Sequence, residues 1–298
     1  MIDVTVVGQI ARDLVLTIDE IPDALASTRV HGRRETLGGK GANQAVSLAQ
    51  LGASVALVGV VADDHDGERL LDRARADGID TGAVVRRAGG RSALIVDIVD
   101  RHAHWRYLED IPDAMLLTEQ DVNAGASALT SARAVIVQLQ QPPAAARTAA
   151  GLAGDALVVL DGATDDRDVL ALADVLRADD METQLLTGQE IHGAGDALRA
   201  AQDVLGRYPR LRLVAFGAGA EGNVFAWADG NLVLPLEDVP VADTTGGGDA
   251  FVAALTLALI RGEQPESAAA AAVAAAAQTV GHAGGRPSLG PEVINSTA

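Results

Sequence analysis

The stretch that decides the fold class is Ala134-Val-Ile-Val-Gln-Leu-Gln-Gln-Pro-Pro-Ala-Ala-Ala-Arg-Thr-Ala-Ala-Gly-Leu-Ala-Gly-Asp-Ala-Leu-Val-Val-Leu160. Its two apolar, β-branched runs, residues 134–139 and 156–160, predict buried strands, and the prolines open an alanine-rich stretch that predicts a helix between them. Strands that alternate with helices in this way form a parallel sheet. We therefore expect an α/β fold, a mostly parallel central sheet with helices on both faces, which binds ligands beyond the carboxyl ends of its strands.

The same alternation continues on both sides of this unit, so we expect residues 1–298 to form a single α/β domain. Predicted strands lie at 2–8, 55–60 and 211–216, and a predicted hairpin lies at 223–234. Predicted helices lie at 42–51, 68–76, 118–129, 168–176, 249–260 and 266–280.

Two segments interrupt the alternation. Residues 14–36 and 84–108 hold short strand-like runs with no helix between the runs. We expect residues 12–37 and 91–109 to pair with each other and to form a small β-sheet that stands off the main body.

Composition excludes several classes of partner. The chain has 41 acidic and 23 basic residues, and its formal net charge of −18 repels nucleic-acid phosphates and anionic lipid surfaces. It has no cysteine, which excludes disulfides and thiol catalysis and fits a reducing compartment. No apolar run approaches the length of a membrane span, and the first residues lack an export pattern. We therefore expect a cytoplasmic protein that binds neither nucleic acid nor membrane.

The single lysine of the chain lies in a glycine run, Gly38-Gly-Lys-Gly-Ala-Asn-Gln44. Every other basic residue is arginine, so Lys40 indicates a pocket that accepts a compact ammonium and excludes a wide guanidinium. The neighbouring glycines let the backbone approach a ligand closely. The alternative is that the one lysine falls there by chance.

A second glycine run, Asp243-Thr-Thr-Gly-Gly-Gly-Asp-Ala-Phe251, precedes a predicted helix. The N–H groups of Gly246, Gly247 and Gly248, together with the helix dipole, predict an anion hole. Asp249 would face the bound anion, and a carboxylate in this place suits phosphoryl transfer to a hydroxyl group that it orients. The alternative is a plain Asp cap after a flexible loop.

Residues 217–222, Gly-Ala-Gly-Ala-Glu-Gly, spell the dinucleotide fingerprint GxGxxG after a predicted strand. The fingerprint requires a helix directly after it, whereas residues 223–234 predict a hairpin. We therefore do not expect NAD to bind there.

The two glycine runs resemble the two signature regions of the ribokinase family of carbohydrate kinases, the PfkB family. They lie about 200 residues apart in the family's order, and the resemblance covers essentially the whole chain. It implies a ribokinase-like fold and transfer of the γ-phosphoryl group of ATP to a primary hydroxyl of a small sugar, most simply D-ribose. It also implies Mg²⁺ and K⁺ as cofactors, and a homodimer formed through the small β-sheet, which would act as a lid over the sugar.

The resemblance assigns roles to residues from both signatures and from the loops between them. Asp249 would be the catalytic base, and Gly246, Gly247 and Gly248 the anion hole. The sugar would be held by Asp13, Gly39, Lys40, Asn43 and Gln140. ATP would lie near Asp179, Glu182, Gly217, Gly219 and Gly222, with Glu182 organising Mg²⁺ indirectly. Potassium would bind near Asp243, Thr245, Gly284 and Ser288.

Among the departures from the family pattern, two fall on proposed ligand-binding residues. Asp179 replaces the asparagine of the family's Asn-x-x-Glu element, and Gln140 stands where ribokinases carry a sugar-binding glutamate. An amide both donates and accepts hydrogen bonds, which changes the hydroxyl pattern that the pocket prefers. These departures leave open a nucleoside kinase, a kinase for another sugar, or a catalytically silent protein that binds a sugar or nucleotide.

Overall fold

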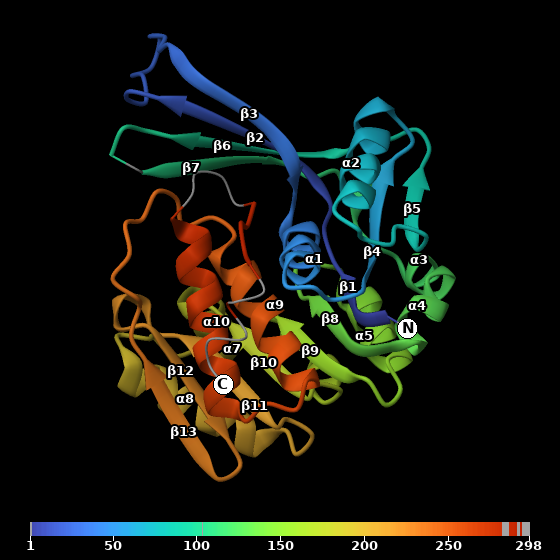
Figure 1. The fold of residues 1–298 in the computed structure, drawn as a ribbon, viewed down its shortest axis with the longest axis vertical. Helices are drawn as coiled ribbons and strands as arrows, with labels where there is room; N and C mark the ends of the chain where they lie inside the picture. Colours follow the sequence, from blue (N-terminus) through green and yellow to red (C-terminus); the bar gives the residue numbers. More distant parts are fainter. Residues whose placement is uncertain (1, 103, 282–285, 291–292, 294–298) are drawn as a thin grey trace.

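The computed structural model describes residues 2–102, 104–281, 286–290 and 293. Within these residues a nine-stranded sheet has the order β13-β12-β11-β10-β9-β8-β1-β4-β5 (Figure 1). Neighbouring strands pair in parallel from β11 to β5, whereas β12 and β13 pair antiparallel, so the expected mostly parallel sheet is confirmed. Its strands are β1 (Ile2–Val7), β4 (Val55–Ala62), β5 (Val84–Arg87), β8 (Ala132–Gln138), β9 (Leu157–Asp161), β10 (Val175–Ala178), β11 (Leu213–Gly217), β12 (Asn223–Trp227) and β13 (Gly230–Leu234).

Helices cover both faces of the large sheet. On β8, Ala134 and Ile136 point into one core and Val135 and Val137 into the other, as the alternation of a strand requires. The first core is closed by α1 (Lys40–Gln50), α2 (His65–Ala76), α9 (Gly247–Ile260) and α10 (Pro265–Val280). The second is closed by α3 (Glu119–Ala124), α4 (Ala126–Thr130), α5 (Pro143–Leu152), α6 (Arg167–Leu170) and α8 (Ala194–Arg207), while α7 (Asp180–Thr187) follows β10.

A separate four-stranded sheet forms from the two segments that interrupt the alternation, in the order β3-β2-β6-β7 within the described residues. In Figure 1 it lies at the top of the view, above α1, α9 and α10. The two segments join through parallel pairing of β2 with β6, so the predicted small sheet is confirmed. Its strands are β2 (Ala11–Ile18), β3 (Val30–Gly38), β6 (Ala93–Val99) and β7 (Trp105–Asp110).

Three sequence predictions were wrong in detail. Residues 118–129 form two helices that meet at Gly125, which has no side chain and packs closely against Val58 and Ala83. Residues 168–176 hold the short α6 and then the start of β10, because an apolar run of this length fits a helix or a buried strand equally well. The strand β5, inside the segment 84–108, pairs with β4 and belongs to the large sheet.

The GxGxxG segment is not followed by a helix. Gly219–Glu221 form one 3₁₀ turn, and the chain continues directly into the hairpin of β12 and β13, as predicted. None of the helices in the described part of the chain is long and apolar enough to cross a bilayer.

Candidate active site

A cavity of about 340 Å³ lies between the small sheet and the carboxyl ends of the parallel strands. This is the position expected for a ligand site in an open α/β sheet. The small sheet contributes Asp13, Val15, Ile95, Asp97, Tyr107 and Glu109. The large sheet and its loops contribute Gln9, Gln140, Arg177 and Asp179. The remaining wall comes from α1 and the start of α9, with Gly39, Lys40, Asn43, Gly246, Gly248 and Asp249.

The register of the small sheet explains which of its side chains face the cavity. Asp13 lies beside Ile95, which lies beside Glu109, and two residues further Val15, Asp97 and Tyr107 form a second row. Side chains in such rows share one face of a sheet. We call these six residues the roof of the cavity, and three of them carry carboxyl groups.

Asp249 lies buried in the first turn of α9, with 6% of its surface exposed. Its carboxylate accepts hydrogen bonds from Asn43 Nδ2 at 3.2 Å and from Gln44 Nε2 at 3.3 Å. Burial raises the pKa of Asp249 to about 7, against the opposing effect of Lys40. A carboxyl group with a pKa near neutrality is suited to exchange a proton with a hydroxyl group in the cavity.

The glycine run before Asp249 forms the start of α9, where the Gly247 N–H bonds to the Thr244 carbonyl oxygen at 3.4 Å. Gly246 adopts φ = 75°, a left-handed conformation that glycine reaches without strain, and α9 begins at Gly247. The N–H groups of the first turn, including those of Gly248 and Asp249, have no partner inside the helix. Gly246 and Gly248 line the cavity, whereas a Cβ on Gly247 would come 2.9 Å from Val280 on α10. The structure thus brings two of the three glycines beside Asp249.

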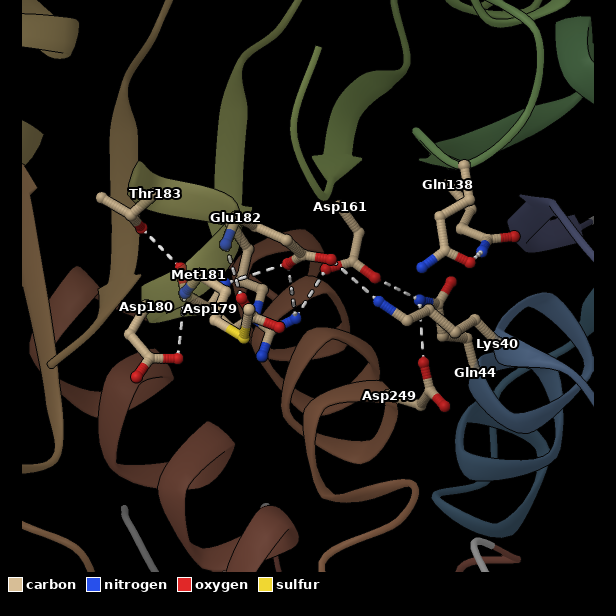
Figure 2. A network of polar contacts seen from close by, with 12 residues as sticks. Lys40, Gln44, Gln138, Asp161, Asp179, Asp180, Met181, Glu182, Thr183 and Asp249 are labelled. Carbon is tan, nitrogen blue, oxygen red and sulfur yellow. Dashed lines mark hydrogen bonds and ion pairs between the residues drawn. The ribbon is translucent and has the colours of Figure 1, made fainter. Parts of the chain in front are cut away.

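A network of charged groups connects α1, β9, β10 and α7 (Figure 2). Lys40 Nζ lies 2.9 Å from Glu182 Oε1, and Arg177 Nη1 lies 3.0 Å from Asp161 Oδ1. Gln44 donates to the second oxygen of Asp161 at 2.7 Å. Burial alone would lower the pKa of Lys40, but Asp161 and Glu182 raise it above its ordinary value. Lys40 therefore lines the cavity with its charge held toward Glu182, the residue expected on the nucleotide side.

Asp179 and Glu182 cap α7 reciprocally. Asp179 Oδ1 accepts from the Glu182 N–H at 2.7 Å, and Glu182 Oε2 accepts from the Asp179 N–H at 3.0 Å. Aspartate caps a helix about as well as asparagine, so the departure from the Asn-x-x-Glu element preserves the local structure. Gly217 packs against this turn, because a Cβ there would come 2.9 Å from the Asp180 nitrogen. Gly219 and Gly222 follow on the same loop, outside the cavity lining.

Some buried polar atoms on the cavity wall have no hydrogen-bond partner among the described residues. Among the described residues, Asp13 Oδ1 and Asn43 Oδ1 are buried and accept no hydrogen bond. Buried polar groups normally have partners, so these atoms fit the hydroxyl donors of a ligand. Burial, with the nearby Asp249 and Asp97, raises the pKa of Asp13 to about 7. Gln140 accepts from Gln138 Nε2 at 2.9 Å.

The residues expected around potassium are only partly brought together. Asp243 Oδ1 accepts from the Thr245 N–H at 2.9 Å and from Thr245 Oγ1 at 2.6 Å, and the Tyr107 hydroxyl of the roof bonds to Thr245. Ser288 is exposed, in a segment that Gln50 holds through Pro287 and Leu289. Gly284 lies outside the described residues. Within the described residues, no group of three or more His, Cys, Asp or Glu side chains could hold a metal ion by itself.

The sequence assignments missed several residues of this site: Gln44, Asp97, Tyr107, Glu109, Asp161 and Arg177. Asp161 and Arg177 could have been found by their position, because both lie at the carboxyl ends of parallel strands. Gln44 is the last residue of the first glycine signature, and its amide holds both Asp161 and Asp249.

Comparison with known proteins agrees with this geometry. Residues 1–291 match the pfkB family carbohydrate kinase model. The chain is 28% identical over 262 residues to ribokinase of Mus musculus, covering 86% of this chain and 81% of that protein. It is 29% identical over 295 residues to an ATP-dependent ribose-1-phosphate kinase of Halopiger xanaduensis, covering 96% of this chain and 94% of that protein.

A solved structure shows the same fold at low sequence identity. Arabidopsis thaliana ribokinase, in complex with ribose and ATP, superposes with a TM-score of 0.81 at 21% identity, covering 100% of this chain and 99% of that one. The chain belongs to the pfkB family of carbohydrate kinases and is accordingly a phosphotransferase that acts on a sugar hydroxyl.

Proposed function

We propose that this kinase transfers the γ-phosphoryl group of ATP to a primary hydroxyl of a small neutral sugar, with D-ribose as the first acceptor to test. One observation carries the proposal: Asp249, the backbone N–H groups at the start of α9, and the oxygens of Asp13 and Asn43 that lack a partner within the described residues meet in one cavity. In this proposal residues 1–298 act as one domain, and the small sheet is its lid.

The chemistry follows from the position of Asp249. Its ionised carboxylate accepts the proton of the acceptor hydroxyl as the oxygen attacks the γ-phosphorus; the new O–P bond forms, the bond to the β-phosphate oxygen breaks, and ADP leaves. The N–H groups of Gly246 and Gly248 stabilise charge on the transferring group. The roof excludes water, which would otherwise hydrolyse ATP.

Two cations belong to the proposal. Asp179 and Glu182 present carboxylate oxygens beside the cavity, which fits a hydrated Mg²⁺ held jointly with the phosphate oxygens of ATP. When bound, Mg²⁺ would neutralise phosphate charge. Asp243 and Thr245, with the exposed Ser288 and with Gly284, which lies outside the described residues, are the proposed region for an activating K⁺.

The charge of the roof favours a neutral acceptor over a phosphorylated one. Asp13, Asp97 and Glu109 all lie on the roof, while the cations of the cavity, Lys40 and Arg177, lie at the other end and pair with carboxylates. Like charges brought together cost free energy in a partly buried site. This supports ribose over ribose 1-phosphate, the substrate in the name of the Halopiger relative.

An acceptor panel followed by ADP release tests the proposal, with D-ribose, D-fructose, ribose 1-phosphate and a nucleoside, each with and without K⁺. We expect the highest kcat/KM for ribose and an increase on adding K⁺. A nucleoside or ribose 1-phosphate in first place would overturn the ribose assignment. Saturable binding of ribose and ATP without ADP release from any acceptor would instead favour a catalytically silent protein.

We also propose a homodimer that forms through the outer face of the lid. Opposite the roof, this face carries Leu14, Leu16, Val96, Ile98 and Leu108, and Leu108 is 60% exposed. Contiguous apolar residues on a surface favour contact with another protein surface. Light scattering should find a dimer for the wild type and a monomer for Leu108→Lys. A wild-type monomer at micromolar concentration would refute the dimer.

A further inference from the structure

Arg177 is a buried cation that has no role in the mechanism proposed so far. It lies near the end of β10 and lines the cavity, and only 13% of its side chain is exposed. Its Nη1 lies 3.0 Å from Asp161 Oδ1 and 3.7 Å from Glu182 Oε2. Although burial alone would lower the pKa of Arg177, these two carboxylates raise it above its ordinary value. The guanidinium is therefore a permanent charge inside the site.

The other side of the guanidinium faces the start of α9. A Cβ on Gly248 would come 2.8 Å from Arg177 Nη2, so Gly248 leaves the room that this group occupies. The guanidinium carbon also lies 5.8 Å from the centre of the Phe251 ring, one turn further along α9. Arg177 is thus fixed against the helix start that forms the anion hole.

The hydrogen-bonding capacity of Arg177 is only half used. Among the described residues, Nη1 has carboxylate partners, whereas Nη2 donates no hydrogen bond. The same two carboxylates also balance Lys40, which lies 2.9 Å from Glu182. A planar guanidinium with one edge held and the other directed at a helix start matches the geometry of a phosphate ligand.

We propose that Arg177 Nη2 donates a hydrogen bond to the transferring γ-phosphoryl group, beside the N–H groups of Gly246 and Gly248. This inference rests on the proposed function, and it adds a side-chain cation to the backbone anion hole. The contact exists in the ATP complex and strengthens as the bond to ADP breaks, because charge then shifts on the phosphoryl oxygens. Arg177 would then affect both the preference for ATP over ADP and kcat.

The test compares Arg177→Met with Arg177→Lys and with the control Arg210→Met. Arg210 pairs with Asp174 at 3.2 Å, outside the cavity lining, so its loss should leave catalysis unchanged. We expect Arg177→Met to lower kcat about 100-fold or more and Arg177→Lys to recover part of the loss. In calorimetric titrations without acceptor, the affinity ratio of ATP to ADP should fall about tenfold in Arg177→Met, the loss of one charge-assisted hydrogen bond.

Each outcome decides a separate point. Arg177→Met with wild-type kcat and a wild-type ratio of ATP to ADP affinities would overturn the inference. If the wild type transfers phosphoryl to no acceptor, the proposed function fails, and the nucleotide affinity ratio alone decides whether Arg177 contacts the γ-phosphoryl group. Because Arg177→Met leaves Asp161 and Glu182 with one cation fewer, thermal unfolding is measured too. If Arg177→Met fails to fold, kcat and the ratio of ATP to ADP affinities in the charge-conserving variant Arg177→Lys decide the question.

Discussion

Replacing Gly38 with alanine should disable the acceptor site without unfolding the protein. A Cβ at this position would lie 1.8 Å from Asp13 Oδ2 and 1.9 Å from its Cγ, so the carboxylate must move away. The atoms in the way are the end of a flexible side chain, and the backbone can therefore stay in place. Gly41→Ala provides the contrast, because its Cβ would come 2.6 Å from the backbone carbon of Gly8 and should destabilise the fold.

The size of the effect follows from what Asp13 is proposed to do. A hydrogen bond between a carboxylate and a sugar hydroxyl is worth about 1.5–3 kcal/mol, which corresponds to a factor of about 10–150 in affinity. At about pH 8, above its pKa of about 7, Asp13 is ionised and the full effect should appear. We expect the KM for ribose to rise by this factor in Gly38→Ala while the Kd for ATP stays constant.

The matched control is Gly206→Ala on α8, where a Cβ meets nothing within 4 Å. Steady-state kinetics give KM, calorimetry gives the ATP Kd, and thermal unfolding shows that each variant is folded. A folded Gly38→Ala variant with unchanged KM for every acceptor in the panel would refute the role of Asp13. A rise in KM together with an equal loss of ATP affinity would point instead to a general distortion of the cavity.

Two further predictions concern charge in the cavity. Because burial raises the pKa of Asp249 to about 7, its base form is lost as the pH falls through this value. Asp13 loses its charge over the same range, so kcat/KM for the acceptor should drop at least tenfold per pH unit below about pH 7. A flat profile between pH 6 and 8, measured by ADP release, would contradict the role of Asp249. Lys40→Arg keeps the positive charge beside Glu182 but places a wider group in the cavity. The KM for the acceptor should therefore rise, while the affinity for ATP changes little. Unchanged acceptor kinetics would contradict the role of Lys40 in holding the acceptor.

The sequence predicted the parallel sheet, the separate small sheet and the hairpin after GxGxxG, because each depends on a local pattern of apolar residues and turns. The family resemblance also assigned both glycine runs to one site, and in the structure Asn43 on α1 donates a hydrogen bond to Asp249 on α9, a helix on the same face of the large sheet. Arg177 was missed because residues 168–176 were expected to form a helix. The strand β10, near whose carboxyl end Arg177 lies, was therefore not predicted.

The roof could not be derived from the pattern of the small sheet. Along β2, Asp13 and Val15 alternate with Leu14 and Leu16, so each face is partly apolar and neither is marked as the inner one. Which face of the small sheet points inward is decided by how the sheet packs over α1 and the start of α9, where the Tyr107 hydroxyl bonds to Thr245. Asp97 and Glu109 line the cavity as a result, and they carry the carboxyl groups on which the proposed preference for a neutral acceptor rests.

The most direct test of the account is to follow a radiolabelled γ-phosphoryl group from ATP to ribose in the wild type and in Asp249→Asn. The account predicts a labelled sugar phosphate from the wild type, and a kcat lower by a factor of about 10²–10⁴ in Asp249→Asn, with binding of ATP and ribose retained. Near wild-type turnover by a folded Asp249→Asn variant would contradict the claim that this carboxylate activates the acceptor hydroxyl.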